Sequence, residues 1–123
     1  MERESTIEFL DGYLEITMKG EFSLEEYAKV MSEVAEMKDL PKELKVLGID
    51  KGIILNIDPE EVILLSKFRE KAVGIYTNVR HAYVVKEPKN TALTFLTSSS
   101  TKSKHYKAEI FSSKKAAIDW LFS

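Results

Sequence analysis

Polar and apolar residues alternate along 7–9 and again along 14–18, and the dipeptide Asp11-Gly12 lies between these two runs. A period of two places successive side chains on opposite faces of a β-strand. Asp-Gly favours a two-residue type I′ turn, because both central residues of that turn need a positive φ angle. The pattern therefore predicts an N-terminal β-hairpin that turns at Asp11-Gly12.

Two longer stretches show the apolar spacing of an amphipathic helix, and each follows a helix start signal. Residues 23–26 (SLEE) form a capping box, which predicts a helix that ends near residues 40–41. Asp58 and Pro59 give a second helix its N-cap and its first residue, and Gly74 lies beyond its end. The apolar stripe expected on the inner face of this second helix is Val62, Leu65, Phe68 and Ala72.

The rest of the chain continues as strands that alternate with helices. Further strands are expected over 46–50, with extended chain over 53–57, and over 80–86 and 106–111. A short helix is expected to begin at Asn90 or Thr91, and a last helix at Ser112 or Ser113. Such alternation implies a mostly parallel sheet with right-handed crossovers. The prediction is a single α/β domain over residues 1–123, with about four to five strands, an N-terminal hairpin and four helices.

Composition narrows the class of protein. The chain has 123 residues, of which 44% are hydrophobic and 31% charged, and this is typical of a soluble globular domain. It contains no cysteine, which excludes disulfides and thiolate metal sites. The first residues, MERESTIEFL, lack the apolar run of a signal peptide, and the longest apolar stretches are too short to cross a bilayer. We therefore expect a cytoplasmic protein without a membrane span.

Charge argues against one class of partner. The net charge is −2, which does not suit a nucleic-acid-binding protein. Its distribution is uneven, since residues 1–79 carry −7 and residues 80–123 carry +5. Such asymmetry marks either a basic face for an acidic partner or ordinary solvated helix surfaces, and we favour the second interpretation.

Ligands of α/β folds gather outside the carboxyl ends of the strands, where the following helices begin. Asp50 is the strongest single candidate there, because it ends a buried strand. Lysines flank the last two helix starts, so a phosphate or an acidic peptide, if one binds, is expected near them. The polar residues expected to bind a partner or ligand at this edge are Asp50, Lys51, Asn56, Asp58, Lys86, Lys89, Asn90 and Lys114.

Other signals of chemistry are weak. His81 and His105 are each expected at the start of a strand, at the opposite edge of the sheet, so we interpret both as surface or capping residues. No spacing of metal ligands, nucleotide-binding loop or nucleophile motif occurs, and we expect no metal, no cofactor and no catalytic residues. The hydroxyl-rich stretch 97–104 (TSSSTKSK) is expected to be a surface loop. Aromatic residues that either fill the core or line an apolar pocket are Tyr13, Phe22, Tyr76, Tyr83 and Phe95.

Five segments together resemble a known family. They are YLEITMKGEFSLEEY (13–27), VLGIDKG (46–52), NIDPEEV (56–62), RHAYVVKEPKNTAL (80–93) and IFSSKKAAIDWL (110–121). Their pattern resembles STAS-type domains, which have the SpoIIAA-like fold of bacterial anti-sigma-factor antagonists. The last two segments are also similar to small bacterial proteins grouped as STAS-like or CRAL–TRIO-like.

The resemblance implies regulation through protein–protein contacts rather than catalysis. In some members of the family, phosphorylation of a serine or threonine at the start of the helix after the central strand acts as a switch. The matching segment here, residues 50–65, contains no serine or threonine, and Ser66 lies inside the predicted helix. The phosphorylation switch is therefore not expected in this chain.

Three functions remain open from the sequence. The leading hypothesis is a non-catalytic STAS-like module that binds a protein partner, and the hairpin edge also allows a homodimer. A second is a carrier of a small apolar or lipid-like ligand, as the CRAL–TRIO-like similarity implies. A third is an enzyme that uses the polar residues Asp50, Asn56, Lys86 and Asn90.

Overall fold

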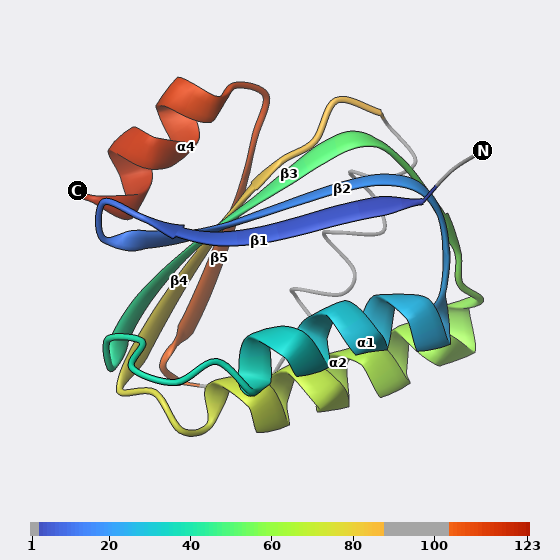
Figure 1. Ribbon diagram of the computed structural model, residues 1–123, viewed down its shortest axis with the longest axis horizontal. Coiled ribbons are helices and arrows are strands. Elements are labelled where there is room, and N and C mark those ends of the chain that lie inside the picture. The colour runs from blue at the N-terminus through green and yellow to red at the C-terminus, as the bar shows by residue number, and fades with distance from the viewer. Residues whose placement is uncertain (1–2, 88–103) are drawn as a thin grey trace.

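The computed structural model describes residues 3–87 and 104–123. Within these ranges the strands are β1 (Glu4–Leu10), β2 (Tyr13–Ser23), β3 (Glu43–Asn56), β4 (Asn78–Val84) and β5 (Tyr106–Phe111). The helices are α1 (Leu24–Ala35), α2 (Pro59–Val73) and α4 (Lys114–Leu121). The chain thus combines one sheet with helices on both of its faces (Figure 1).

The five strands form one sheet in the order β1-β2-β3-β4-β5, so neighbours in the sheet are also neighbours along the chain. β1 is antiparallel to β2, and the three remaining pairs are parallel. The connections that carry α1 and α2 both step in the same direction, and right-handed crossovers then place both helices on one face. α4 covers the other face (Figure 1). The predicted mostly parallel sheet is confirmed from β2 onwards.

The number of helices differs from the prediction. The sequence predicts four helices, and the described residues contain three. The helix expected at about residues 90–96 lies in the range 88–103, outside the described residues. The same holds for residues 97–103 of the hydroxyl-rich stretch.

The N-terminal hairpin follows its sequence signal closely. The register pairs Leu10 with Tyr13, which leaves Asp11 and Gly12 as the two turn residues. Their φ angles are 25° and 89°, the positive values that a tight hairpin turn needs. β1 forms an edge of the sheet, so the edge on which the predicted homodimer depends is present. The homodimer itself stays a prediction.

β3 is one long strand with a bulge, whereas the sequence suggested two shorter extended segments. The register with β2 pairs Met18 with Asp50 and then Gly20 with Ile53, so β3 holds one extra residue at this point. Gly52 within the bulge has a φ angle of 104°, which glycine adopts without steric cost. The Asp50 carboxylate accepts hydrogen bonds from the N–H groups of Gly52 (2.8 Å) and Ile53 (2.7 Å). A side chain therefore satisfies backbone groups at the bulge.

Both predicted helix starts on this face are confirmed. At α1 the Ser23 hydroxyl accepts from the Glu26 N–H at 3.2 Å, and the Glu26 carboxylate accepts from the Ser23 N–H at 3.0 Å. At α2 the Glu61 carboxylate accepts from the N–H of the N-cap Asp58 at 2.9 Å. The end of α1 was predicted wrongly, since the helix stops at Ala35, several residues before the expected end.

The inner face of α2 also differs from the predicted stripe. Val62 and Leu65 are buried as expected, but Phe68 is 46% exposed. Arg69 is buried instead, with 3% of its surface accessible. A helical period of 3.6 residues places positions 62, 65 and 69 on the same side of the helix. Position 68 lies about 100° from position 69 around the helix axis. The apolar pattern misled the prediction because the inner stripe of α2 includes a charged residue.

Side chains on the two faces of the sheet form separate cores, because successive residues of a strand alternate between faces. The core under α4 consists of Tyr13, Leu47, Ala82, Val84, Ala117 and Leu121. Under α1 the buried residues are Met18, Phe22, Val30 and Ile53. A third cluster consists of Leu44, Val46, Tyr76, Val79 and Tyr106. A cavity lies on the α1–α2 face.

Candidate functional site: a cavity between the sheet and α1–α2

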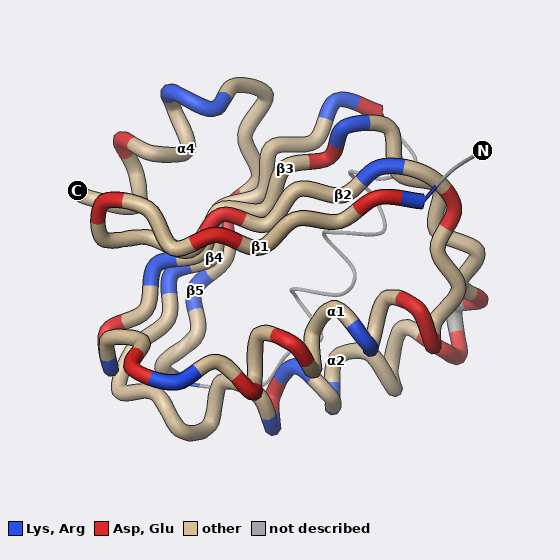
Figure 2. Tube along the Cα trace, in the orientation of Figure 1, with Lys and Arg blue, Asp and Glu red and all other residues tan. Residues whose placement is uncertain are grey.

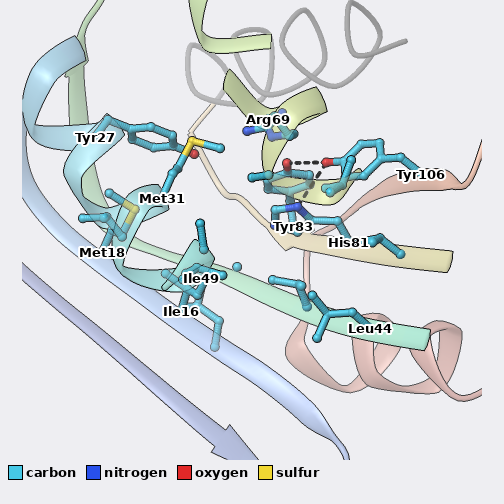
Figure 3. Close-up of a pocket in the computed structure, with 18 of the residues that line it drawn as sticks. Ile16, Met18, Tyr27, Met31, Leu44, Ile49, Arg69, His81, Tyr83 and Tyr106 are labelled. Carbon is cyan, nitrogen blue, oxygen red and sulfur yellow. Dashed lines mark hydrogen bonds between the residues drawn. The ribbon is translucent and has the colours of Figure 1, made fainter. Parts of the chain in front are cut away.

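A cavity of about 130 Å³ lies between the sheet and the helices α1 and α2 (Figure 3). Strands β2 to β5 supply side chains on one side of it, and the two helices supply those on the other. Gly48 of β3 makes room for the rings of the neighbouring strand. A Cβ atom at Gly48 would lie 3.4 Å from His81 Nε2 and 3.6 Å from Tyr83 Cδ1. The missing side chain therefore lets two rings of β4 lie beside β3.

One part of the cavity is apolar. Its lining includes Ile16 and Met18 of β2, Val30 and Met31 of α1, and Ile53 of β3. Figure 3 shows Met18 on the side of the cavity away from Arg69, with Met31 between Tyr27 and Arg69. Methionine is unbranched and flexible, so it adapts its shape to fill gaps or to cover a ligand. This part can hold an apolar group of variable shape.

The other part of the cavity contains a buried cation. Arg69 lies on α2 and lines the cavity, with 3% of its surface accessible. Its Nε and Nη1 atoms have no hydrogen-bond partner in the described part of the chain. Tyr27 and Tyr106 are the hydrogen-bonding neighbours of its side chain. Within the described residues Arg69 forms no ion pair, so a guanidinium that stays charged at any physiological pH lies here without a counter-ion.

The rings of Tyr83 and Tyr106 lie beside the Arg69 guanidinium, and the His81 ring lies next to Tyr83 (Figure 3). The Tyr83 ring centroid is 5.8 Å from Arg69 Cζ, which is within the range of a cation–π interaction. The Tyr83 and Tyr106 hydroxyl oxygens are 2.9 Å apart, and Tyr106 Oη is 3.1 Å from His81 Nδ1. The His81 and Tyr83 rings are stacked, with centroids 3.9 Å apart. Tyrosine hydroxyls and a histidine thus form a connected polar cluster beside the cation.

Burial sets the protonation of this cluster. It lowers the pKa of His81 well below its ordinary value, and the positive charge of Arg69 lowers that pKa further. It raises the pKa of Tyr83 well above its ordinary value, and it raises the pKa of Tyr106 as well. At neutral pH both phenols are therefore protonated and the imidazole is neutral. Tyr83 can then donate to Tyr106, which in turn donates to His81 Nδ1, and Arg69 supplies the positive charge of the cluster.

Arg80 shows how a cation on the opposite face is satisfied. Its Nη1 atom donates to the carbonyl oxygens of Trp120 at 2.9 Å and Ser123 at 3.0 Å, at the end of α4. Arg80 also lies in register with Lys45 of β3 and Lys107 of β5. Figure 2 shows these basic positions side by side on neighbouring strands. The carbonyl groups at a helix C-terminus carry partial negative charge, so α4 offsets part of this basic row.

The structure places four predicted site residues along the last part of β3 and the start of α2. Asp50 lines the cavity, and its carboxylate is held by the bulge. Lys51 is exposed beside it, and Asn56 Nδ2 donates to the carboxylate of Glu21 on β2. Asp58 is exposed as the N-cap of α2. Asp50 is thus the one among these four that borders the cavity.

The other predicted residues lie elsewhere or outside the described ranges. Lys86 is exposed after the end of β4. Lys114 begins α4 and forms an ion pair with Glu15 of β2 at 2.9 Å, on the face opposite the cavity. Lys89 and Asn90 lie outside the described residues. The roles of all these residues in binding, and the enzymatic use of Asp50, stay predictions.

The expected position of the site rests on a feature that the described strands lack. Crevices at the carboxyl ends of parallel strands arise where the strand order reverses. The order of β1 to β5 contains no reversal. The N-termini of α1 and α2 lie on one face of the sheet and that of α4 on the other, so these three helix starts do not converge (Figure 1). The cavity therefore lies against one face of the sheet rather than at the strand ends.

Two side-chain interpretations change with the cavity in place. His81 was predicted to be a surface or capping residue, and this is wrong, because its ring lines the cavity and bonds to Tyr106. Alternation along β4 puts His81 on the same face as Tyr83, and the helices then cover both. Of the aromatic residues that might line a pocket, Tyr76 and Tyr83 do so. Tyr13 and Phe22 are buried in the core clusters, and Phe95 lies outside the described residues.

Sequence reasoning missed Arg69, the most unusual residue of the site. A signal for it exists, since position 69 is four residues after Leu65 and seven after Val62, on the apolar side of the helix. A charged residue at such a position is normally interpreted as the boundary of the apolar stripe. A polar residue in register with a buried face is therefore the pattern that could have identified it.

The described part of the chain lacks two other kinds of feature. None of its helices has the length and apolar character needed to cross a membrane. No three His, Asp or Glu side chains within 3–87 and 104–123 gather as a metal site would require. The expectations of a cytoplasmic location, no cofactor and no nucleic-acid partner stay predictions from the sequence.

The fold defines the class of this protein. The described residues form a hairpin followed by parallel strands in sequential order, with two helices on one face of the sheet and a C-terminal helix on the other. An uncharacterised protein of the DUF3478 family from Shewanella loihica PV-4, whose crystal structure has a SpoIIAA-like fold, is similar over 97% of this chain and 93% of that chain. The TM-score is 0.57 and the sequence identity 20%.

This likeness confirms the predicted STAS-like fold, and at such identity it concerns the fold alone. A comparison with protein-family models finds no match. A comparison with curated proteins finds none either. The function of the chain therefore depends on the geometry and chemistry of the cavity, because one fold can carry many functions.

Proposed function

We propose that this chain is a non-catalytic STAS-like module that binds a small, mainly apolar molecule in the cavity between the sheet and α1–α2. The observation that carries the proposal is a cavity of about 130 Å³ with mainly apolar walls and polar groups gathered in one part. Small-molecule sites commonly combine these two properties. An engineered apolar cavity of about 150 Å³ in another protein binds benzene, so this volume suits one aromatic ring or a short branched chain.

Two features support binding rather than catalysis. The pKa of His81 is lowered and that of Tyr83 is raised, so neither group exchanges a proton near pH 7. General acid–base catalysis works best when the pKa of the group lies near the working pH. Asp50 is engaged by two backbone N–H groups, which favour its role as a structural carboxylate.

The proposal can be tested with toluene as the probe. In a ¹H–¹³C spectrum of the methionine methyl groups, toluene should shift the signals of Met18 and Met31, which line the cavity. Ala72 also lines the cavity, and Ala72→Leu adds volume there. This variant should bind toluene at least about tenfold more weakly, because its side chain occupies part of the space that the probe needs.

The matched control is Ala116→Leu, which makes the same change at an exposed position of α4. It should leave the toluene-dependent shifts unchanged. The proposal is wrong if the wild-type methionine signals do not respond to toluene. It is equally wrong if Ala72→Leu binds the probe as well as the wild type does.

A protein partner is the second candidate, and one observation favours it. The outer face of α2 and the turn after it expose large apolar side chains, with Ile63 57%, Leu64 56%, Phe68 46% and Ile75 59% accessible. Apolar residues that cluster on a surface often mark an interaction site. A STAS-like module that binds a protein would offer such a face.

A double variant tests this candidate separately from the cavity. Leu64→Lys with Phe68→Lys should abolish the recovery of a stoichiometric partner in affinity purification from the native cells, and it should leave toluene binding unchanged. Lys67→Ala, at an exposed polar position on the same helix, serves as the control. Recovery of the same partner by the double variant, or of none by the wild type, would count against the second candidate.

A further inference from the structure

We propose that the natural ligand of the cavity is a small organic acid of the carboxylate class, whose anionic group pairs with Arg69 and whose apolar body lies against Met18 and Met31. This inference rests on the proposed function, because it specifies what the cavity binds. It starts from the one feature of the site that the fold does not explain.

That feature is the unpaired state of Arg69. A charge removed from water is costly unless a counter-ion or hydrogen bonds replace the lost solvation. Two of the three guanidinium nitrogens, Nε and Nη1, lack a hydrogen-bond partner among residues 3–87 and 104–123, while the residue is 3% exposed. By contrast, Arg80 has carbonyl partners and lies at a helix end. A ligand anion would supply the partner that the described residues do not give Arg69.

The surroundings of Arg69 favour an oxygen anion. A tyrosine hydroxyl can donate a hydrogen bond, and the Tyr27 hydroxyl neighbours the guanidinium. Arginine matches the geometry of carboxylates and forms short, charge-assisted hydrogen bonds with them. Asp50, the carboxylate that also lines the cavity, accepts from the backbone of its own bulge.

The remaining walls specify the rest of the ligand. The rest of the lining is mainly apolar and includes two flexible methionines, Met18 and Met31 (Figure 3). A volume of about 130 Å³ admits a body no larger than one aromatic ring or a short branched chain. An inorganic anion would satisfy the cation and leave this apolar part empty. The combination therefore indicates a compact amphipathic acid.

The experiment compares probes that differ in the polar group. Benzoate and benzyl alcohol carry the same ring, and only benzoate is negatively charged. Isothermal titration of the wild-type chain with each probe therefore measures how much the negative charge contributes to the affinity. Benzoate should bind about tenfold or more tightly than benzyl alcohol, since hydrogen bonds to charged groups contribute more than neutral ones. Arg69→Met should abolish this preference. Arg80→Met, the same change on the other face, should keep the preference.

A second readout uses the neighbouring histidine and needs no variant. The positive charge of Arg69 contributes to the lowered pKa of His81. Bound benzoate would offset this charge, so the pKa of His81 followed by NMR should rise with benzoate and not with benzyl alcohol. Inorganic phosphate is the third probe, and it should bind at least about tenfold more weakly than benzoate because it has no apolar body.

The outcomes separate this inference from the proposed function. If toluene and benzyl alcohol bind but benzoate is not preferred, or if Arg69→Met retains the preference, the organic-acid inference is overturned and the proposed function stands. If phosphate binds as tightly as benzoate, the inference that the ligand has an apolar body is overturned. If no probe binds, both proposals fail.

Discussion

Arg69 shows how a residue can be costly for the fold and useful for binding. The side chain is buried among tyrosines, and the described residues give two of its nitrogens no hydrogen-bond partner. Unsatisfied polar groups in a folded protein often mark functional sites, because function, unlike stability, can require them. His81 belongs to the same arrangement, since its neutral ring depends on burial and on the neighbouring cation. Both residues lead to predictions that can be measured without a ligand.

Arg69→Met should stabilise the ligand-free protein. Methionine fills a similar volume and removes an unpaired buried charge, so the free energy of unfolding should rise by roughly 1–3 kcal/mol. Urea denaturation followed by circular dichroism measures this change. Arg80→Met should lower the same free energy by about 1 kcal/mol, because it removes hydrogen bonds to the end of α4. A loss of stability in both variants would show that Arg69 has a structural role.

Stability should fall in weak acid because of His81. The folded-state pKa lies well below the unfolded value near 6.5, so the unfolded chain binds the proton more readily. The stability that comes from the neutral ring is therefore fully present above about pH 6.5, and it decreases as the pH falls below that value, by at most about 1.4 kcal/mol per pH unit.

His81→Asn removes the titrating ring and keeps a polar group close to the position of Nδ1. In urea denaturation between pH 7 and pH 5, the free energy of unfolding of this variant should depend less on pH than that of the wild type. Equal pH dependence in the two proteins would mean that His81 does not titrate with a lowered pKa.

At the scale of elements, local signals decide where strands and helices begin, and packing decides which face points inward. The hairpin turn and the starts of α1, α2 and α4 follow from a few adjacent residues and occur where the sequence predicts them. The inner face of α2 depends on what it packs against, and there the apolar pattern placed Phe68 inside although Arg69 is buried. The sequence left Ser112 and Ser113 as alternatives for the last cap, and the structure assigns the role to Ser113.

This assignment predicts a difference between neighbouring serines. The Ser113 hydroxyl accepts from the Ala116 N–H at 3.2 Å. Ser113→Ala should therefore lower the free energy of unfolding by about 1 kcal/mol, as is usual for an N-cap. Ser112→Ala, at the adjacent exposed position, should change it by less than about 0.5 kcal/mol. Equal losses in thermal or urea unfolding would show that both serines contribute to the helix start.

At the scale of the whole molecule, the two faces of the sheet have different roles. The helix α4 packs on one face, where its residues Ala117 and Leu121 are fully buried. The other is covered by α1 and α2 and retains the cavity (Figure 1). Charge follows the same division, since the basic row of Lys45, Arg80 and Lys107 lies at the end of α4 and Arg69 lies in the cavity. A ligand that fills the cavity should therefore stabilise the fold as a unit.

Benzoate at about 100 times its Kd should raise the free energy of unfolding of the wild type by about 2.7 kcal/mol, because it binds the folded state and not the unfolded chain. Thermal denaturation with and without the probe measures this effect. Ala72→Leu should show little stabilisation at the same concentration, whereas Ala116→Leu should match the wild type. Stabilisation of Ala72→Leu equal to that of the wild type would place the probe outside the cavity.

The resemblance of five segments to STAS-type domains indicated the fold. The sequence by itself determined the hairpin, the two capped helices α1 and α2, and the final strand and helix. These depend on turn geometry, capping and the alternation of apolar residues, which are properties of short segments. Only the tertiary structure decided that Arg69 and His81 lie together in a cavity, that Asp50 binds its own bulge, and that the site lies on a face of the sheet. The physical reason is that burial and pairing depend on residues far apart in the chain, and a charged side chain carries no local signal that its neighbours will exclude water.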